Sequence, residues 1–211
     1  VMQLESGRST SVTGGVFRVQ SGEGTATSSG SMTIQSSNSG VSGVSGCLVF
    51  SSGSAKSGNS GCVIIGSGSA SGGCCGAVAV HVGSGTSGAG GALSASAGRS
   101  TSVTGGMVVV SSGEGTATSS GAIFVQSMNA GDSGVSGQLV FSSGSAQGGN
   151  SGSLFVGTGA ASNGRGGAVS ITAGSGTSGW GGRLSVSSGR STSTSGGIVA
   201  VSSGEGTATS S

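Results

Sequence analysis

Apolar residues recur along this chain at a fixed distance from a regularly spaced glycine. The recurrent glycines fall 15 residues apart, or 16 at one step of each long repeat, at Gly15, Gly30, Gly46, Gly61, Gly76, Gly91, Gly106, Gly121, Gly137, Gly152, Gly167, Gly182 and Gly197. One apolar residue stands two positions after each of them and another stands four positions after, as Leu48 and Phe50 follow Gly46. This period of two, in segments rich in Val and Ile, predicts a half-buried β-strand.

The rest of each unit alternates with small residues, as in residues 68–72 and 113–117. It predicts a second strand that faces the first and offers only Gly, Ala or Ser to the interior. The large side chains of the first strand would then fill a thin core. Glycines are expected to supply positive φ at the corners and to let the two strands approach closely.

A longer repeat of 91 residues contains six of these units. Residues 7–15 return unchanged at 98–106 and with two differences at 189–197, so super-repeats begin at 7, 98 and 189. A single unit buries too little apolar surface to offset its loss of chain entropy, whereas stacked units share a continuous core. The pattern predicts an all-β fold: a parallel β-solenoid (β-helix) with 15 residues and two strands per coil, continuous over 1–211 and cut from a longer chain.

The predicted first strand also carries apolar residues on its outer side. Solvated faces are rarely this apolar, and a contiguous apolar patch usually marks an interface. The candidate lateral interface comprises Val49, Ile64, Val109, Phe124, Val140 and Phe155. It predicts self-association into a fibre, as a homo-oligomer or as laterally paired solenoids.

Composition narrows the range of partners. The chain has 50 Gly and no Pro, 6% charged residues and a net charge of +2. Nucleic acids and anionic membranes require a concentrated basic face, so neither is an expected partner. The apolar runs are too short for a membrane span. The many Ser and Thr hydroxyls leave O-linked glycans open.

No residue constellation indicates catalysis. Residues 83–88 and 174–179 match G-x-G-x-x-G, but a dinucleotide site needs a following helix and β-type repeats follow here. The chain has one His, His81, and one Asp, Asp132, which solenoid spacing would hold about 19 Å apart. We therefore expect no enzyme activity, no catalytic or cofactor-binding residues, no metal site and no cofactor.

Four cysteines occur only in the first long repeat. Cys47 and Cys62 each follow a recurrent glycine, and Cys74 and Cys75 are adjacent. The equivalent positions of the next repeat hold Gln138, Ser153, Arg165 and Gly166. The sequence leaves two alternatives open: a disulfide between Cys47 and Cys62, as an oxidising compartment would favour, or free thiols.

The amino-acid sequence of the repeats resembles that of a known group of proteins. Residues 82–93, 112–121 and 134–144 resemble the long Gly/Ser/Thr-rich tandem-repeat β-solenoid surface proteins of diatoms and other unicellular marine algae. The resemblance implies a large extracellular or cell-surface protein and transfers no catalytic residue. We expect a structural protein that forms an extracellular filament or stalk by stacking and lateral packing of coils. The alternative is an ice-binding or adhesive solenoid, because eight units carry Thr at their fourth position: Thr10, Thr25, Thr86, Thr101, Thr116, Thr177, Thr192 and Thr207.

Overall fold

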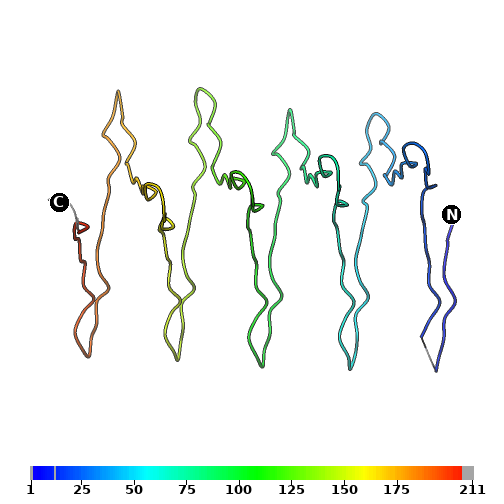
Figure 1. Ribbon diagram of the computed structural model, residues 1–211, viewed down its shortest axis with the longest axis horizontal. Coiled ribbons are helices and arrows are strands. Elements are labelled where there is room, and N and C mark those ends of the chain that lie inside the picture. The colour runs from blue at the N-terminus through cyan, green and yellow to red at the C-terminus, as the bar shows by residue number, and fades with distance from the viewer. Residues whose placement is uncertain (1, 12, 206–211) are drawn as a thin grey trace. The chain divides into compact units, whose positions relative to one another are not determined.

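The structure, a computed structural model, describes residues 2–11 and 13–205. None of these residues lies in a helix or a β-strand (Figure 1). The chain runs instead in extended segments that bend once per unit, for example at residues 25–27, 56–58 and 71–73. The prediction of an all-β parallel β-solenoid, or β-helix, is therefore wrong for the described residues.

The backbone hydrogen bonds explain the difference. A compact domain contains about one internal hydrogen bond per residue, whereas nine backbone–backbone bonds occur in the described part of this chain, each between two glycines. A strand needs a neighbouring backbone whose N–H and C=O groups face its own. Alternating apolar residues favour an extended backbone, but they do not supply that neighbour. The extended segments therefore form without a sheet.

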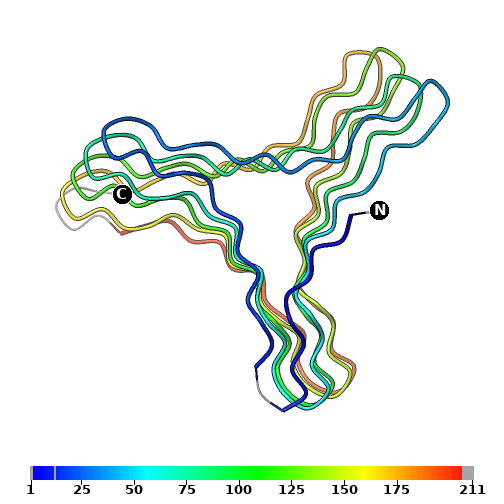
Figure 2. The same cartoon turned by 90° about the vertical axis from the view of Figure 1, so that its right-hand side faces the viewer.

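Contacts divide the chain into two units, Val1–Val108 and Val109–Ser211. Within the first unit, the loops that bend near residues 56 and 101 point the same way, and the loop near residue 71 points elsewhere (Figure 2). One 15-residue repeat therefore does not make one coil, which corrects the predicted coil length. The prediction of one continuous segment over 1–211 stays a prediction.

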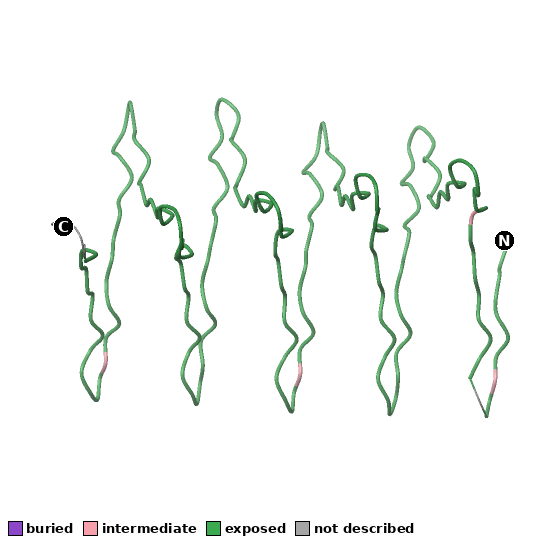
Figure 3. Cartoon of the chain, in the orientation of Figure 1, coloured by how far each residue is buried: buried purple, intermediate pink, exposed green. Residues whose placement is uncertain are grey.

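No described residue is buried (Figure 3). Five are partly shielded: Ser9, Ser21, Ser100, Gly115 and Ser191. The accessible surface is 20602 Å², whereas a folded monomer of this mass would expose about 8,000 Å². The thin core predicted between the two faces of each unit is not formed by this single chain.

The recurrent glycines have one of the two roles predicted for them. No described glycine has a positive φ, so the bends do not depend on left-handed backbone. A Cβ at Gly15 would lie 3.0 Å from the backbone nitrogen of Gly7, and one at Gly106 would lie 3.1 Å from that of Gly98. These glycines are needed where two chain segments approach closely, which was the second role expected of them.

Candidate functional site

A nine-residue loop with glycine at both ends occurs in most units. In seven of them the N–H of the last glycine donates to the carbonyl oxygen of the first, over 2.8 to 3.4 Å. We call these the closed loops: residues 7–15, 22–30, 83–91, 98–106, 113–121, 174–182 and 189–197. The bond fixes the neck of each loop and leaves its fourth residue exposed.

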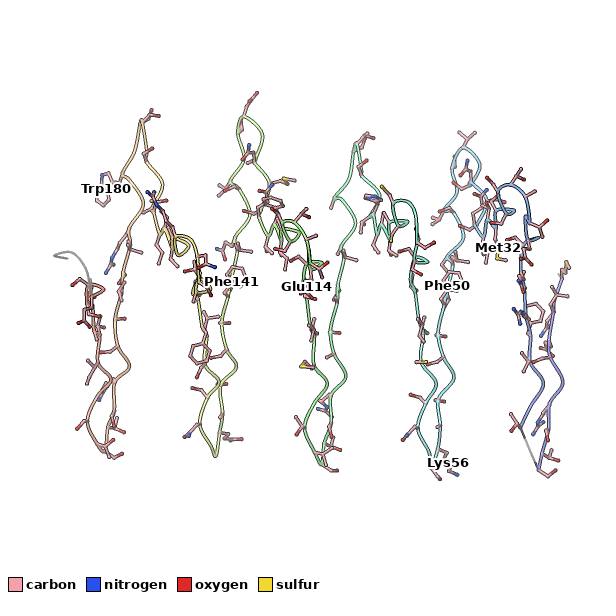
Figure 4. The ribbon with its side chains drawn as sticks, in the orientation of Figure 1. Met32, Phe50, Lys56, Glu114, Phe141 and Trp180 are labelled. Carbon is pink, nitrogen blue, oxygen red and sulfur yellow. The ribbon has the colours of Figure 1, made fainter. Side chains whose placement is uncertain are left out.

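Four loops have the same terminal glycines but form no such bond. We call these the open loops: residues 53–61, 68–76, 144–152 and 159–167. The third residue separates the two classes, because it is Ser or Gly in every closed loop and Ala in every open one. At the tip of an open loop, Lys56 extends into solvent (Figure 4).

A serine at the third position closes the loop through its hydroxyl. Ser100 Oγ accepts hydrogen bonds from the backbone N–H of Ser102 at 3.4 Å and of Val103 at 3.1 Å. Ser191 Oγ accepts from the N–H of Ser193 and, at 3.0 Å, from that of Thr194. This is the local side-chain-to-backbone bonding that Ser offers at turns. The serine therefore folds the first half of the loop back on itself.

A glycine at the third position closes the loop by leaving room. A Cβ at Gly85 would lie 2.8 Å from the carbonyl oxygen of Gly88, and one at Gly176 would lie 2.9 Å from that of Gly179. Real Cβ atoms do not approach an oxygen this closely. Alanine has neither the hydroxyl of Ser nor the space of Gly, which explains why loops with Ala stay open.

The 16-residue units form a third kind of loop. Each has a tight turn, at residues 41–42 and 132–133. The N–H of Gly43 donates to Gly40 O at 3.5 Å, and that of Gly134 donates to Gly131 O at 3.2 Å. Val41 and Val135, which lie in these loops, are almost fully exposed.

The apolar residues of the extended segments form the second candidate site. The six residues of the predicted lateral interface are between 68% (Val109) and 91% (Phe155) exposed. The predicted inward residues, two positions after each recurrent glycine, are between 47% (Met32) and 68% (Leu93) exposed. The other predicted inward residues, four positions after each recurrent glycine, reach 94% at Val201, so the expected order is not kept, and none of these residues is covered. Figure 4 labels Met32, Phe50 and Phe141 along these segments. The lateral interface itself stays a prediction.

An apolar hollow lies in the part of the chain formed by Val1–Val108. It has a volume of about 350 Å³ and is lined by Phe50, Val63, Ile64 and Ile65. It therefore combines Ile64, predicted to face outward, with three residues predicted to face inward. Cys62 directly precedes Val63 in the chain, and Cys47 stands three residues before Phe50.

All four cysteines are exposed free thiols: Cys47, Cys62, Cys74 and Cys75. The Cys47–Cys62 disulfide is not formed in this structure and stays a prediction. Among the described residues, no three His, Cys, Asp or Glu side chains come together as a metal ion would require. Nor does this part of the chain contain a helix suited to crossing a membrane. Trp180 is fully exposed beside the neck of a closed loop (Figure 4).

Seven of the eight threonines at the fourth position lie at the bend of a closed loop and are exposed. The eighth, Thr207, lies outside the described residues. Nothing in the structure explains why closed loops carry Thr at their fourth position. The third-residue rule was not anticipated, although aligning the eleven nine-residue loops would have separated Ala from Ser and Gly.

Comparisons with protein-family models, with curated protein sequences and with solved structures give no match. The functional inference therefore depends on the residues of this chain.

Proposed function

We propose that this chain is a structural, non-catalytic protein that assembles side by side with further copies of itself outside the cell. The observation that carries the proposal is that uncovered apolar side chains recur regularly along the sequence. Every described residue at the six lateral positions is at least 68% exposed. Water contact at so many Val, Ile and Phe side chains is unfavourable by about 25 cal/mol per Å² of apolar surface.

The surface of the chain is large enough for such assembly. Its 20602 Å² exceeds the surface of a compact monomer of this mass by about 12,000 Å². A stable protein–protein interface needs about 1,600 Å² in total. Several neighbours could therefore contact one chain. The net charge of +2 over 211 residues gives little electrostatic repulsion between copies.

Repetition supports a fibre rather than a closed dimer. The same loops and apolar positions return every 91 residues. A partner that matches one repeat also matches the next, so contacts multiply along the chain. An isolated copy would lose chain entropy on ordering without burying apolar surface in return. We therefore expect order to develop on assembly.

The test is concentration-dependent self-association of the purified chain, followed by light scattering and sedimentation. Replacing two strongly exposed residues, Phe124→Ser with Phe155→Ser, should raise the concentration needed for assembly at least about tenfold. The matched control replaces Val41 and Val135, which are at least as exposed but lie in the loops of the 16-residue units, and should leave assembly unchanged. A wild-type chain that stays monomeric at high concentration would overturn the proposal.

A second candidate is ice binding or adhesion through the threonines of the closed loops. The observation that favours it is that all seven described threonines of this kind are exposed at a bend. Ice-binding activity would appear as thermal hysteresis of the purified chain and should fall when Thr86 and Thr177 are replaced by Ala. Normal freezing with wild-type protein would remove this candidate and leave the structural one.

A further inference from the structure

We propose that residues 47–75 form a covalent cross-linking site, at which the thiols of one chain form disulfides with those of a second copy. This rests on the proposed lateral assembly. All four cysteines of the chain lie in this segment, and each is exposed and unpaired. The remaining 182 of the 211 residues contain none.

The thiols are not needed for the local structure. The open loop 68–76 contains Cys74 and Cys75, and its counterpart 159–167 is also open although Arg165 and Gly166 stand in their place. Loops 53–61 and 144–152 are likewise both open, with Cys62 following one and Ser153 the other. The cysteines therefore add something that the repeated fold does not require. A covalent link between two chains, formed in the 91-residue repeat that carries the cysteines, would be such an addition.

The cysteines also lie apart from the closed loops. Every nine-residue loop that contains or adjoins a thiol has a neck without the Gly-to-Gly bond between its first and ninth residues. A neck that is not fixed by a backbone hydrogen bond leaves its flanking residues freer to adjust. Disulfide formation requires such adjustment, because the two Cα atoms must come within about 7 Å.

The apolar hollow, whose lining residues Phe50 and Val63 follow Cys47 and Cys62 closely in the chain, identifies where a second copy would dock. Its lining residues Phe50, Val63 and Ile65 can be covered by the exposed apolar side chains that every copy carries. A twofold contact between identical chains places the same surface of each against the other. The segment 47–75 of one copy would then face the segment 47–75 of its partner, which brings thiols to thiols.

The chemistry needs an oxidant, for which we name a small-molecule disulfide such as oxidised glutathione. A thiolate of one chain attacks a glutathione sulfur, forms a mixed disulfide and releases one glutathione thiolate. A thiolate of the second chain attacks the protein sulfur and releases the other. Two protein thiols lose two electrons and two protons, and oxidised glutathione gains them to become two glutathione thiols.

The experiment mixes equal amounts of ¹⁵N-labelled and unlabelled full-length chain with oxidised glutathione. We expect covalent dimers and larger species on non-reducing electrophoresis, reversed by dithiothreitol. Mass spectrometry should find disulfide-linked peptides that combine both isotopes. Linked peptides of one isotope only, as a Cys47–Cys62 bond within each chain would give, would overturn the proposal, and so would thiols that stay reduced.

A variant without cysteines separates this inference from the proposed function. With all four cysteines replaced by Ser, light scattering should still show assembly, without covalent species. If that variant assembles but wild-type cross-links form only within chains, this inference alone fails. If neither variant nor wild-type assembles and no cross-link joins two chains, both fail.

The hollow itself is tested by Ile64→Ser, a change at a residue that is 86% exposed. It should slow interchain cross-linking about fivefold by weakening docking. The control, Val135→Ser in the second unit, should leave the rate unchanged. A thiol-reactive dye should label both variants as fast as wild-type. Equal cross-linking rates in the two variants would show that the hollow does not dock the partner.

Discussion

Closed and open loops have the same length and the same terminal glycines, yet only one class forms a backbone hydrogen bond between those glycines. Loop 83–91 begins Gly-Ser-Gly-Thr and is closed, whereas loop 144–152 begins Gly-Ser-Ala-Gln and is open. The terminal glycines permit the close approach but do not determine it. A single side chain inside the loop, at the third position, decides whether the approach becomes a hydrogen bond.

The comparison is sharpened by the two ways of closing. Ser191 accepts two backbone N–H groups, whereas Gly176 makes room for a carbonyl oxygen. Ser closes a loop with its hydroxyl acceptor and Gly closes one by leaving space, and Ala provides neither. The loops therefore follow local chemistry rather than hydrophobic packing.

The largest effect on amide exchange is expected when a methyl group fills the space at a third-position glycine. Gly176→Ala places a methyl group 2.9 Å from the carbonyl oxygen of Gly179, so loop 174–182 should open. We expect exchange of the Gly182 amide with solvent to become about tenfold faster, as loss of one hydrogen bond implies. Nuclear magnetic resonance of the labelled chain measures this exchange.

The control for that change lies in the same loop. A Cβ at Gly179 meets open space, so Gly179→Ala should leave the Gly182 amide unchanged. If both variants exchange alike, a steric role for the third residue is wrong.

The reverse change should close an open loop. Ala146→Gly with Gln147→Thr gives loop 144–152 the same first four residues as loop 83–91. The Gly152 amide should then exchange several-fold more slowly, because it gains a carbonyl acceptor. A scalar coupling across the new hydrogen bond to Gly144 would report closure directly. Gln147→Thr alone should do nothing, and closure by that single change would assign the decision to Thr instead.

A smaller effect is expected at the serine of a closed loop. Ser191→Ala removes an acceptor that serves the N–H groups of Ser193 and Thr194. Because Ala at the third position leaves a loop open, the Gly197 amide should exchange a few-fold faster. The rise should stay below about tenfold, since the exposed N–H groups of Ser193 and Thr194 can bond water instead. Ser191→Thr keeps the hydroxyl and should behave as wild-type. A Thr variant as fast as the Ala variant would argue against the hydroxyl as the cause.

The smallest effect concerns an open loop with its own cross-neck contact. Thr158 Oγ1 donates to the carbonyl oxygen of Gly167 at 3.1 Å. Thr158→Val keeps the shape and removes the donor, and we expect a change of the Gly167 carbonyl chemical shift without any change in neighbouring loops. Thr158→Ser, which retains the donor, should show no shift. A change that spread to loop 174–182 would mean that the loops are not independent.

The sequence indicated the alternation of apolar residues within an extended segment, but its prediction of backbone pairing into a sheet was wrong. The spacing of Leu48 and Phe50 correctly indicates an alternating extended segment, because alternation is a local property. It cannot indicate which backbone lies beside that segment, since a sheet is formed by pairing between distant residues. The inference from Phe17 and Val19 to a buried β-strand failed at this step.

The glycines show the same division. Close approach at Gly106 could be expected from glycine alone, but the positive φ expected at corners is not found. The role of Ser100 could have been predicted from the turn chemistry of Ser. The apolar hollow could not have been predicted, because its lining combines Phe50 with residues from the next 15-residue unit.

The closed loops give the chain a reserve of length. Drawn out fully, the eight residue steps between Gly22 and Gly30 span about 27 Å, whereas their hydrogen-bonded atoms lie 2.9 Å apart. Pulling on the chain would break one weak bond at a time, and each would release roughly 20 Å of slack before the covalent backbone took the load. Such bonds re-form when tension falls. A filament built from this chain would stretch and recover in small steps, and the share of closed loops among its repeats would set how far.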